Sequence, residues 1–494
     1  MTDEVDKQIS APTDNLRYRV VSGVAFIGVA QAIRVTVQFV SVIVMSRLLT
    51  PADFGVMAMI SPVIAFVMLL QGMGLASAVA NARDVTHSQL STVFWINVGI
   101  SAVLAVLVAA GAPLVGLFYK EPATVGPTIA MAVLIFVSGL GSQHTALINR
   151  QMRFRRTAMV DAASSVLSLA AGICVALMWP NPWALVSSIM AGSLVSVVGA
   201  WWVSQWRPGP PSSLKEVSMF LRFGRGVTGF NLANFLARNL DNVLIGRFAG
   251  TAELGFYDRA YKLLLFPLQQ INGPVARVLT PVLSRLAHEP ERYRSAYTRA
   301  VQQILLATVP GVVCLLTNAA TAIPTVLGQQ WTPTIPIFMW LGFSALIQPM
   351  SATTGWLFIT QHRTDEFAAW GVFVAITCIG AFVCGLPWGA VGVAAAYTLS
   401  EIFIRLPVVL WLVGRKGPVG TRHLFALAWP NIVANGVAAG VLLLLPIDIG
   451  LAPVPDLLIR LIVAYLVCWS VLALFPAGRT AFAETLKTVS ALRP

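Results

Sequence analysis

The sequence predicts an all-α polytopic membrane protein of about 14 transmembrane helices, built as two parallel six-helix lobes followed by a C-terminal helix pair. Of the 494 residues, 57% are hydrophobic and only 11% are charged, whereas charged residues make up about a quarter of soluble domains. The mean hydropathy is +0.77. Apolar runs of roughly 20 residues, each long enough to cross ~30 Å of hydrocarbon as a helix, recur from Val20 almost to the C-terminus.

The N-terminal segment, residues 1–205, begins with a largely polar stretch of nineteen residues that includes Asp3 and Glu4. This pattern is not that of a cleavable signal peptide, so we expect a cytoplasmic tail. Six apolar runs follow, each bounded by polar residues, Gly or Pro. They predict helices over 20–46, 54–79, 90–117, 126–148, 157–178 and 182–204.

The polar segment from Gln205 to Arg225 ends the first lobe, because it is rich in Pro, Ser and charge, and residues 206–225 are expected to form a cytoplasmic linker. The second lobe, 226–413, contains apolar runs that predict helices over 226–246, 256–284, 300–326, 335–360, 366–385 and 389–413. A basic connector from Gly414 opens an additional segment, 414–494, with helices expected over 424–445 and 456–476 and a cytoplasmic tail.

The distribution of Lys and Arg orients these helices. Of the 33 such residues, 23 lie in tails and connectors on the same side as the N-terminus, and only Arg47, Lys120 and Arg247 lie on the other side. The positive-inside rule therefore predicts that both termini are cytoplasmic. Because most of the Lys and Arg residues lie in these tails and connectors, we interpret the net charge of +13 as a topology signal and not as a nucleic-acid-binding surface.

An internal repeat relates the two lobes at an offset of 200 residues. SRLLTPADFGV from Ser46 aligns without a gap to GRFAGTAELGF from Gly246. The same offset pairs Gln31 with Asn231, Arg34 with Asn234 and Gln38 with Arg238, at spacings that place each set on one helical face. An even number of helices separates the repeats, so the lobes should have the same orientation, and transporters of this kind bind substrate between the halves.

Charged residues inside the predicted helices are the candidate site residues, since each costs on the order of 2.5–3.5 kcal/mol to insert at membrane depth. Most are cationic, and guanidinium groups pair well with phosphate oxygens. We therefore expect a cationic cavity that binds a phosphate-bearing molecule. Its candidate residues are Arg34, Arg238, Arg277, Arg259, Lys262, Gln31, Gln38, Asn231 and Asn234.

Other interpretations of these charges remain open. Arg238 with Asp241, and Glu401 with Arg405, have the spacing of ion pairs that fix helix packing. Arg259 and Lys262 lie near a helix end, where long side chains reach the interface. If transport is coupled to an ion, then Asp241, Asp258 and Glu401 are the candidate carboxylates.

No enzymatic motif is evident. The five histidines lie in loops or near helix ends, and Walker A and HExxH patterns are absent. The five cysteines fall in apolar segments without metal-ligand spacing. We therefore expect no cofactor, no metal site and no catalytic residue.

Two segments carry a family resemblance that covers nearly the whole chain: SRLLTPADFGVMAM from Ser46 and YDRAYKLLLFPLQQINGPVARVLTPVLSRL from Tyr257. Together with the 14-helix plan, the chain resembles the polysaccharide transporters of the multidrug/oligosaccharidyl-lipid/polysaccharide exporter superfamily, nearest to the colanic acid and succinoglycan type.

This resemblance implies a flippase of the bacterial inner membrane that moves undecaprenyl-pyrophosphate-linked oligosaccharide repeat units for exopolysaccharide synthesis by alternating access. It also implies contact with membrane lipids and a functional association with a polysaccharide polymerase and co-polymerase. No nucleic-acid partner is expected.

Three alternatives stand beside this interpretation. A multidrug antiporter of the same superfamily would need acidic residues for cationic drugs, whereas Arg and Lys dominate here. A membrane glycan polymerase or ligase would need a large outer loop, but the outer connectors span around ten residues. A scaffold for polysaccharide synthesis would leave the intramembrane charges unexplained.

Overall fold

The computed structural model describes residues 16–72, 86–151, 153–211, 239–445, 452–476 and 478–479, with side chains omitted at 16–27, 154, 265–267, 269–271 and 274. Helices make up most of these ranges, and strands are absent from them. Contacts divide the chain into two compact units, which we call unit 1 (Met1–Gly255) and unit 2 (Phe256–Pro494).

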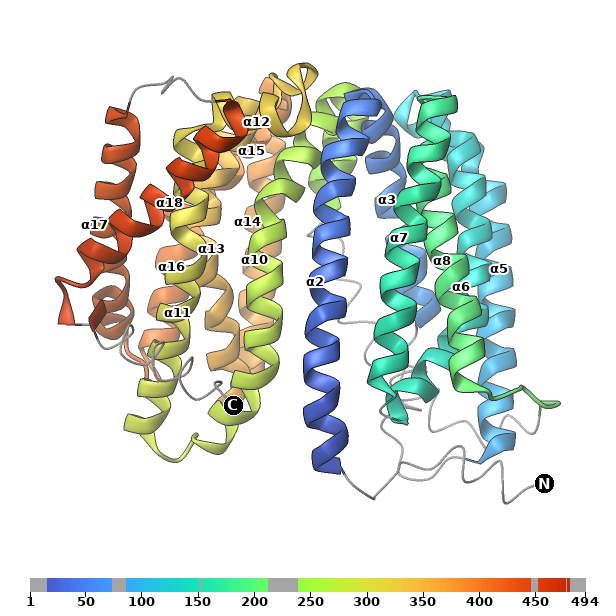
Figure 1. Ribbon diagram of the computed structural model, residues 1–494, viewed down its shortest axis with the longest axis horizontal. Helices are drawn as coiled ribbons and strands as arrows, with labels where there is room; N and C mark the ends of the chain where they lie inside the picture. Colours follow the sequence, from blue (N-terminus) through green and yellow to red (C-terminus); the bar gives the residue numbers. More distant parts are fainter. Residues whose placement is uncertain are drawn as a thin grey trace. The chain divides into compact units, whose positions relative to one another are not determined.

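Unit 1 is a helix bundle (Figure 1). Its helices are α2 (Leu16–Leu48), α3 (Pro51–Gly72), α5 (His87–Tyr119), α6 (Val125–Arg150), α7 (Phe154–Met178) and α8 (Trp183–Ser204), with a short 3₁₀ turn η1 (Pro122–Thr124) before α6. Helix α7 packs against both α2 and α8, and α6 packs against α5 and α8. The buried apolar side chains of α3, α5, α6 and α8, among them Ile60 and Ile135, form its core.

Capping residues explain the bounds of α5. Thr86 is the N-cap, and its hydroxyl accepts the Gln89 backbone N–H at 3.2 Å while the Gln89 side chain accepts the Thr86 N–H at 3.1 Å. Lys120 ends the helix in the left-handed conformation, with φ of 56°. This reciprocal capping box starts α5 at His87, three residues before the predicted start.

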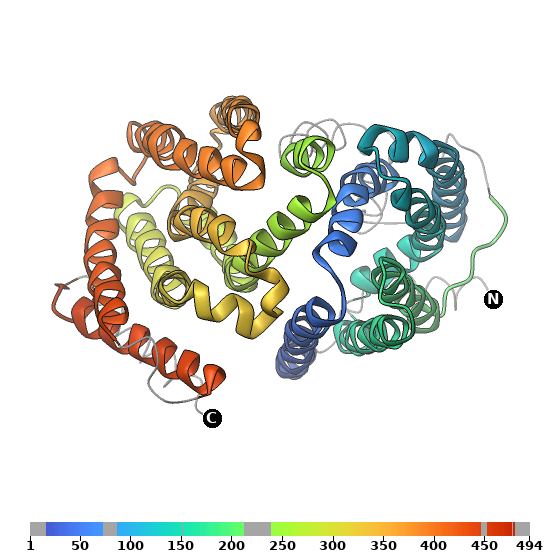
Figure 2. The ribbon, with the colours of Figure 1, turned by 90° about the horizontal axis from the view of Figure 1, so that it is seen from above.

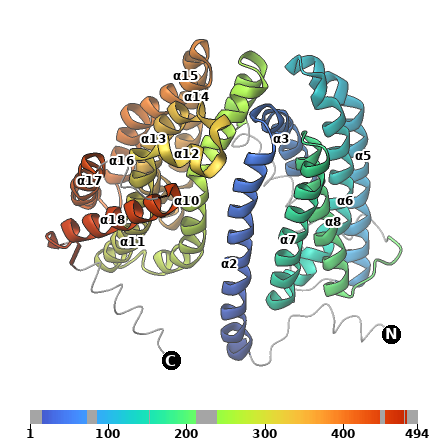
Figure 3. The ribbon, with the colours of Figure 1, turned by 45° about the horizontal axis from the view of Figure 1, so that its top comes forward.

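Residues 239–248 of unit 1 are also helical, and the other helices belong to unit 2. They are α10 (Thr251–Arg285, whose first five residues belong to unit 1), α11 (Pro290–Thr317), α12 (Ala319–Leu327), α13 (Thr334–Thr360), α14 (Thr364–Gly385), α15 (Gly389–Ser400), α16 (Leu406–Gly414), α17 (Thr421–Leu444) and α18 (Pro453–Leu472), with short turns η3 (Gln329–Trp331) and η4 (Leu386–Trp388) and the π-helical turn η5 (Glu401–Arg405). Helices α13, α14 and α15 lie side by side (Figure 3). Helices α17 and α18, red in Figure 2, pack on α11 at the edge of unit 2.

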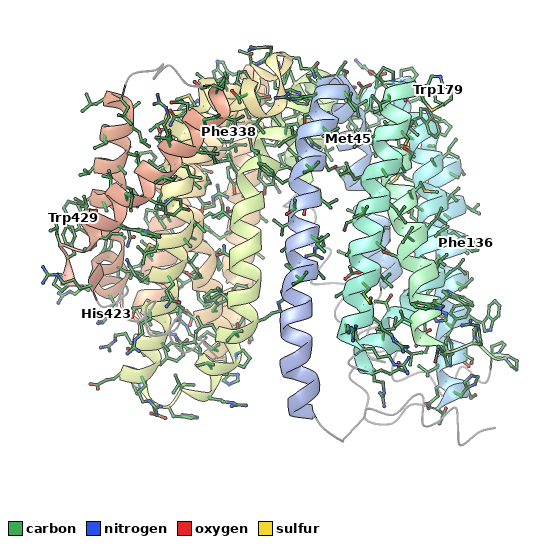
Figure 4. The ribbon with its side chains drawn as sticks, in the orientation of Figure 1. Met45, Phe136, Trp179, Phe338, His423 and Trp429 are labelled. Carbon is green, nitrogen blue, oxygen red and sulfur yellow. The ribbon has the colours of Figure 1, made fainter. Side chains whose placement is uncertain are left out.

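Eleven stretches of the described chain are long and apolar enough to cross a membrane. One of them, Thr364–Gly414, holds both the α14 and the α15–α16 helices, and α10 is not among them. Exposed apolar side chains cover the helix surfaces: Trp179 and Trp429 point outward, whereas Met45 and Phe338 are buried (Figure 4). This is the surface of a multi-pass membrane protein, whose outer face contacts lipid.

The predicted helix over 300–326 was wrong at both ends. Helix α11 begins at Pro290, because Tyr293 and Tyr297 are buried in its first two turns and reach Thr360 and Thr353 with their hydroxyls, at 2.6 and 3.2 Å. Charged residues on the other face of these two turns lower the mean hydropathy of the segment, so the apolar pattern did not predict that the helix includes them. The expected end was wrong because α11 stops at Thr317 and a separate helix, α12, follows.

The two repeat motifs meet within unit 1. A β-carbon added to Gly55 would collide with the backbone oxygen of Thr251, and one added to Gly255 would collide with the backbone oxygen of Pro51. The residue pairs 51/251 and 55/255 differ by 200, so the two contacts are related by the repeat itself. The first turns of α3 and α10 therefore cross at backbone contact, which only glycine permits here.

The beginning of the predicted linker is docked on unit 1. Trp206 is 2% exposed, and its ring contacts those of His87, Phe94 and His144 with centroid distances of 5.8, 6.0 and 5.3 Å. Trp206 thus fills a space between α5, α6 and the end of α8.

Backbone hydrogen bonds hold the following residues. Gly209 donates its N–H to Ser91 Oγ at 2.9 Å and accepts the Trp95 indole N–H at 2.9 Å. We call residues 205–211 the docked segment. Residues 212–238 lie outside the described ranges, so the predicted boundary between the lobes stays a prediction.

Candidate functional site

The polar stripe of α2 is present in unit 1. Arg34 and Gln38 are exposed and Gln31 is half-buried. Asp161 of α7 lies close enough for its charge to interact with that of Arg34. A guanidinium has five N–H donors, so a carboxylate neighbour leaves donors for another anion.

The matching stripe of the second repeat cannot be compared, because Asn231, Asn234 and Arg238 lie outside the described residues. Asp241, at the end of that stripe, is described and buried. One of its carboxylate oxygens accepts the backbone N–H of Asn242 at 2.8 Å.

A charged cluster on α10 joins three predicted site residues. The buried carboxylate of Asp258 lies 2.8 Å from Lys262 Nζ and 3.6 Å from Arg259 Nη2. Arg259 is nearly buried, whereas the Lys262 side chain is half exposed. One carboxylate between two cations leaves a net positive charge. Arg277, on the same helix, is exposed.

Glu401 forms an ion pair with Arg405 across η5, with 2.9 Å between Oε2 and Nε. Leu406 donates its N–H to the Glu401 carbonyl, five residues back, which is the bond that defines a π-turn. Arg405 also donates to Cys378 Sγ at 2.7 Å and to the Tyr397 carbonyl at 2.8 Å. This is the arrangement expected of an ion pair that fixes helix packing, and it leaves Glu401 bound to an internal cation.

Sequence reasoning missed the partners that lie on distant helices. Asp161 beside Arg34, and Cys378 beside Arg405, have no local signal, because each is brought in by helix packing. The pairs at i, i+4 were visible because helical spacing alone determines them.

Three comparisons with known proteins place these features in context. The family model described as "Polysaccharide biosynthesis protein" matches residues 44–336, more than half of the chain. The lipopolysaccharide biosynthesis protein WzxC of Escherichia coli (strain K12) is 26% identical over 87% of this chain and 89% of its own length. The succinoglycan biosynthesis transport protein ExoT of Rhizobium meliloti (strain 1021) is 27% identical over 86% of each chain.

Among solved structures, the lipid II flippase MurJ in its inward closed conformation is similar in fold. The TM-score is 0.74, with 14% sequence identity, over 91% of this chain and 98% of that chain. At this identity the likeness shows the fold alone.

Proposed function

This chain belongs to the polysaccharide biosynthesis protein family, and we propose that it is a flippase for undecaprenyl-pyrophosphate-linked oligosaccharide repeat units. It would move them across the bacterial inner membrane for exopolysaccharide synthesis, with both termini in the cytoplasm, between the glycosyltransferases that build the unit and a polymerase that joins the units. The relative named as a transport protein supports transport over catalysis.

The observation that carries the proposal is the excess of cations over carboxylates on α2 and α10. Arg34 on α2, and Arg259 with Lys262 on α10, present guanidinium and ammonium groups in the two units. A pyrophosphate needs counter-charge to cross a medium of low dielectric constant, whereas its polyprenyl chain can stay in lipid. A cationic drug would be repelled by the same groups.

We also propose that Asp258 links ion binding to substrate binding. Its carboxylate is shared by Lys262 and Arg259, so a coupling ion that binds Asp258 would compete with the Lys262 ammonium and make it available to a phosphate. Glu401 is less suited to this role, because it is held by Arg405 inside unit 2. Asp241 remains a third candidate for ion coupling, and Arg238, Arg277, Asn231 and Asn234 remain candidate ligands.

The experiment is a leaflet-resolved assay of the lipid-linked repeat unit in proteoliposomes, comparing wild type with Arg34→Ala. Loss of charge-assisted hydrogen bonds to phosphate should lower the transport rate roughly 10- to 100-fold. Arg34→Lys should retain part of the rate, because it keeps the charge and loses the fork of donors.

Arg156→Ala is the matched control, since it removes an exposed arginine at the start of α7. It should transport at the wild-type rate. Equal rates for Arg34→Ala and wild type would remove the basis for a cationic binding site.

A further inference from the structure

A cluster of charges lies where the connector between α16 and α17 meets the start of α14. Glu366 of α14 pairs with three cations there. Its carboxylate lies 2.7 Å from Arg363 Nη2, 3.3 Å from Lys416 Nζ and 3.6 Å from Arg415 Nη2. The other acidic residue of this turn, Asp365, is exposed. The cluster therefore holds three cations and at most two carboxylates, which leaves a net positive charge.

Arg363 is committed to the fold, because it fixes the end of α16. Its guanidinium donates to the backbone carbonyls of Leu412 at 2.7 Å and Lys416 at 2.9 Å, in addition to Glu366. The last carbonyls of a helix have no partner within the helix, so an arginine that donates to them holds the helix end in place. The excess charge of the cluster is therefore carried by Arg415 and Lys416.

The connector is also held from its other side. Arg294 of α11 donates its Nε–H to the Pro418 carbonyl at 2.8 Å. Gly417 has a φ of 100°, in the left-handed region that favours glycine, and a β-carbon there would collide with the Gln361 side chain. The two cations before Gly417 thus project from a backbone that is already ordered, which lowers the entropy cost of binding a ligand.

Both cations have hydrogen-bond donors to spare. The Arg415 side chain is 42% exposed and that of Lys416 is 63% exposed. Among the residues that the structure describes, none accepts a hydrogen bond from the Arg415 guanidinium, which has five N–H donors. The Lys416 ammonium uses one of its three donors, for Glu366. Two charged groups are therefore open to an acceptor from outside the protein, and phosphate oxygens suit both of them.

The position of Arg415 places this pair at the edge of the lipid-facing surface. Trp411 and Arg415 are four residues apart, so they share a helix face, and the guanidinium lies 4.8 Å from the centroid of the Trp411 ring. Trp411 is 59% exposed, and Phe403, about two turns earlier, is 71% exposed. Exposed apolar side chains of a membrane-spanning helix contact lipid, and Trp beside Arg is typical of the headgroup level. Lipid phosphates are therefore the anions that are concentrated next to Arg415.

We propose that Arg415 and Lys416 bind the phosphate of an anionic phospholipid headgroup, at the point where α16 leaves the membrane. Anionic lipid is favoured over zwitterionic lipid, because a zwitterionic headgroup brings its own ammonium group, which the excess positive charge repels. The bound lipid offsets that charge and ties the junction of α14 and α16 to the membrane surface. The inference does not depend on the flippase proposal, since it concerns bulk lipid and not the lipid-linked saccharide.

The experiment measures thermal unfolding of the full chain, purified in detergent and delipidated, with added phosphatidylglycerol, phosphatidylcholine or inorganic phosphate. Phosphatidylglycerol should raise the unfolding temperature of wild type in a saturable way, because a ligand that binds only the folded state stabilises it. The double variant Arg415→Gln with Lys416→Gln should need roughly 10-fold more phosphatidylglycerol for half of this effect, because it loses two charge-assisted contacts. Phosphatidylcholine and inorganic phosphate should shift the unfolding temperature little.

Arg292→Gln is the control, because Arg292 is an exposed arginine of the same unit with a carboxylate of its own, Glu289, at 2.6 Å. It should respond to phosphatidylglycerol as wild type does. Lys416→Gln alone leaves Arg415 over the Trp411 ring and should show an intermediate response, so the test stands even where the double variant folds poorly.

Three results would overturn the proposal. One is the same response to phosphatidylglycerol in wild type and in the double variant. Another is equal stabilisation of wild type by phosphatidylcholine, which would mean that the site does not select for charge. The third is equal stabilisation by inorganic phosphate, which would assign the site to a soluble anion. None of these measurements uses transport, so they stay interpretable if the flippase proposal fails.

Discussion

At the scale of single residues, the buried charges of unit 2 form pairs at i, i+4. Glu401 pairs with Arg405, and Asp456 pairs with Arg460 at 2.8 Å. Each pair is neutral as a whole, which reduces the cost of holding an ionised group away from water. Arg34 differs, because it is exposed on its helix and its acidic neighbour comes from another helix.

Replacing Arg405 alone should be severe. Arg405→Met leaves the Glu401 carboxylate without its cation, and removing one partner of a buried pair costs roughly 3–5 kcal/mol. Combining Glu401→Leu with Arg405→Met should recover much of this loss, since no buried charge remains. Thermal unfolding of the purified protein in detergent measures both effects.

Arg415→Met serves as the comparison, because Arg415 is a partly exposed arginine that lies over the Trp411 ring. This variant should unfold near the wild-type temperature. A wild-type unfolding temperature for Arg405→Met would mean that the pair is not needed for stability.

At the scale of helices, two features are packed too tightly to accept a change of side-chain size. One is the crossing of α3 and α10, and the other is the docked segment. The crossing depends on two glycines whose neighbours are backbone atoms, which cannot move aside as a flexible side chain would. The docked segment depends on one large ring, that of Trp206, surrounded by three other aromatic rings.

Gly55→Ala and Gly255→Ala should each destabilise the protein by roughly 1–3 kcal/mol or more, because the new methyl group meets backbone oxygen. The measurement is the unfolding temperature together with the yield of monodisperse protein. Gly111→Ala in α5 is the control, since a β-carbon there meets nothing within 4 Å. If all three variants unfold alike, the close crossing does not exist in solution.

Trp206→Ala should release the docked segment. Hydrogen exchange followed by mass spectrometry should show faster exchange at the Gly209 amide, which is now bonded to Ser91 Oγ. Trp202→Ala changes an exposed ring on the neighbouring turn and should leave that exchange rate unchanged. Equal protection in both variants would show that the hydrogen bonds alone hold the segment.

The positions of helices were more predictable than their contacts. Apolar runs identified α6, α8 and α13 within a few residues, because a membrane-crossing helix must be apolar along its length. The first turns of α11 escaped prediction, since Tyr293 and Tyr297 are buried among charged neighbours. The contact of Arg405 with Cys378 could not be predicted, because Cys378 lies on α14 and reaches η5 only through helix packing.

At the scale of the whole molecule, two units with separate cores make up one chain. The core of unit 1 is built from α3, α5, α6 and α8, and that of unit 2 from α11, α13, α16 and α17 with buried residues such as Tyr293, Leu357 and Leu424. The charge distribution predicts that the connectors rich in Arg and Lys face the cytoplasm.

Cysteine labelling tests this orientation. In a chain whose five native cysteines are replaced by alanine, Ala123→Cys, in the exposed turn before α6, should react with an impermeant maleimide in intact cells. Lys416→Cys, in the connector before α17, should react only after the membrane is permeabilised. The reverse pattern would invert the predicted topology.

The docked segment has a consequence for synthesis on the ribosome. The site for Trp206 is built from α5, α6 and α8, all of which precede it in the chain. The 283 residues after Pro211 take on the order of 15–60 s to translate at roughly 5–20 residues per second. We therefore consider a nascent chain that is arrested shortly after residue 211 has left the ribosome and entered the membrane. In this chain Trp206 should already be buried, which fluorescence quenching of arrested chains can measure. The docked segment would then stabilise the helix bundle of α5, α6 and α8 before the helices of unit 2 have been synthesised.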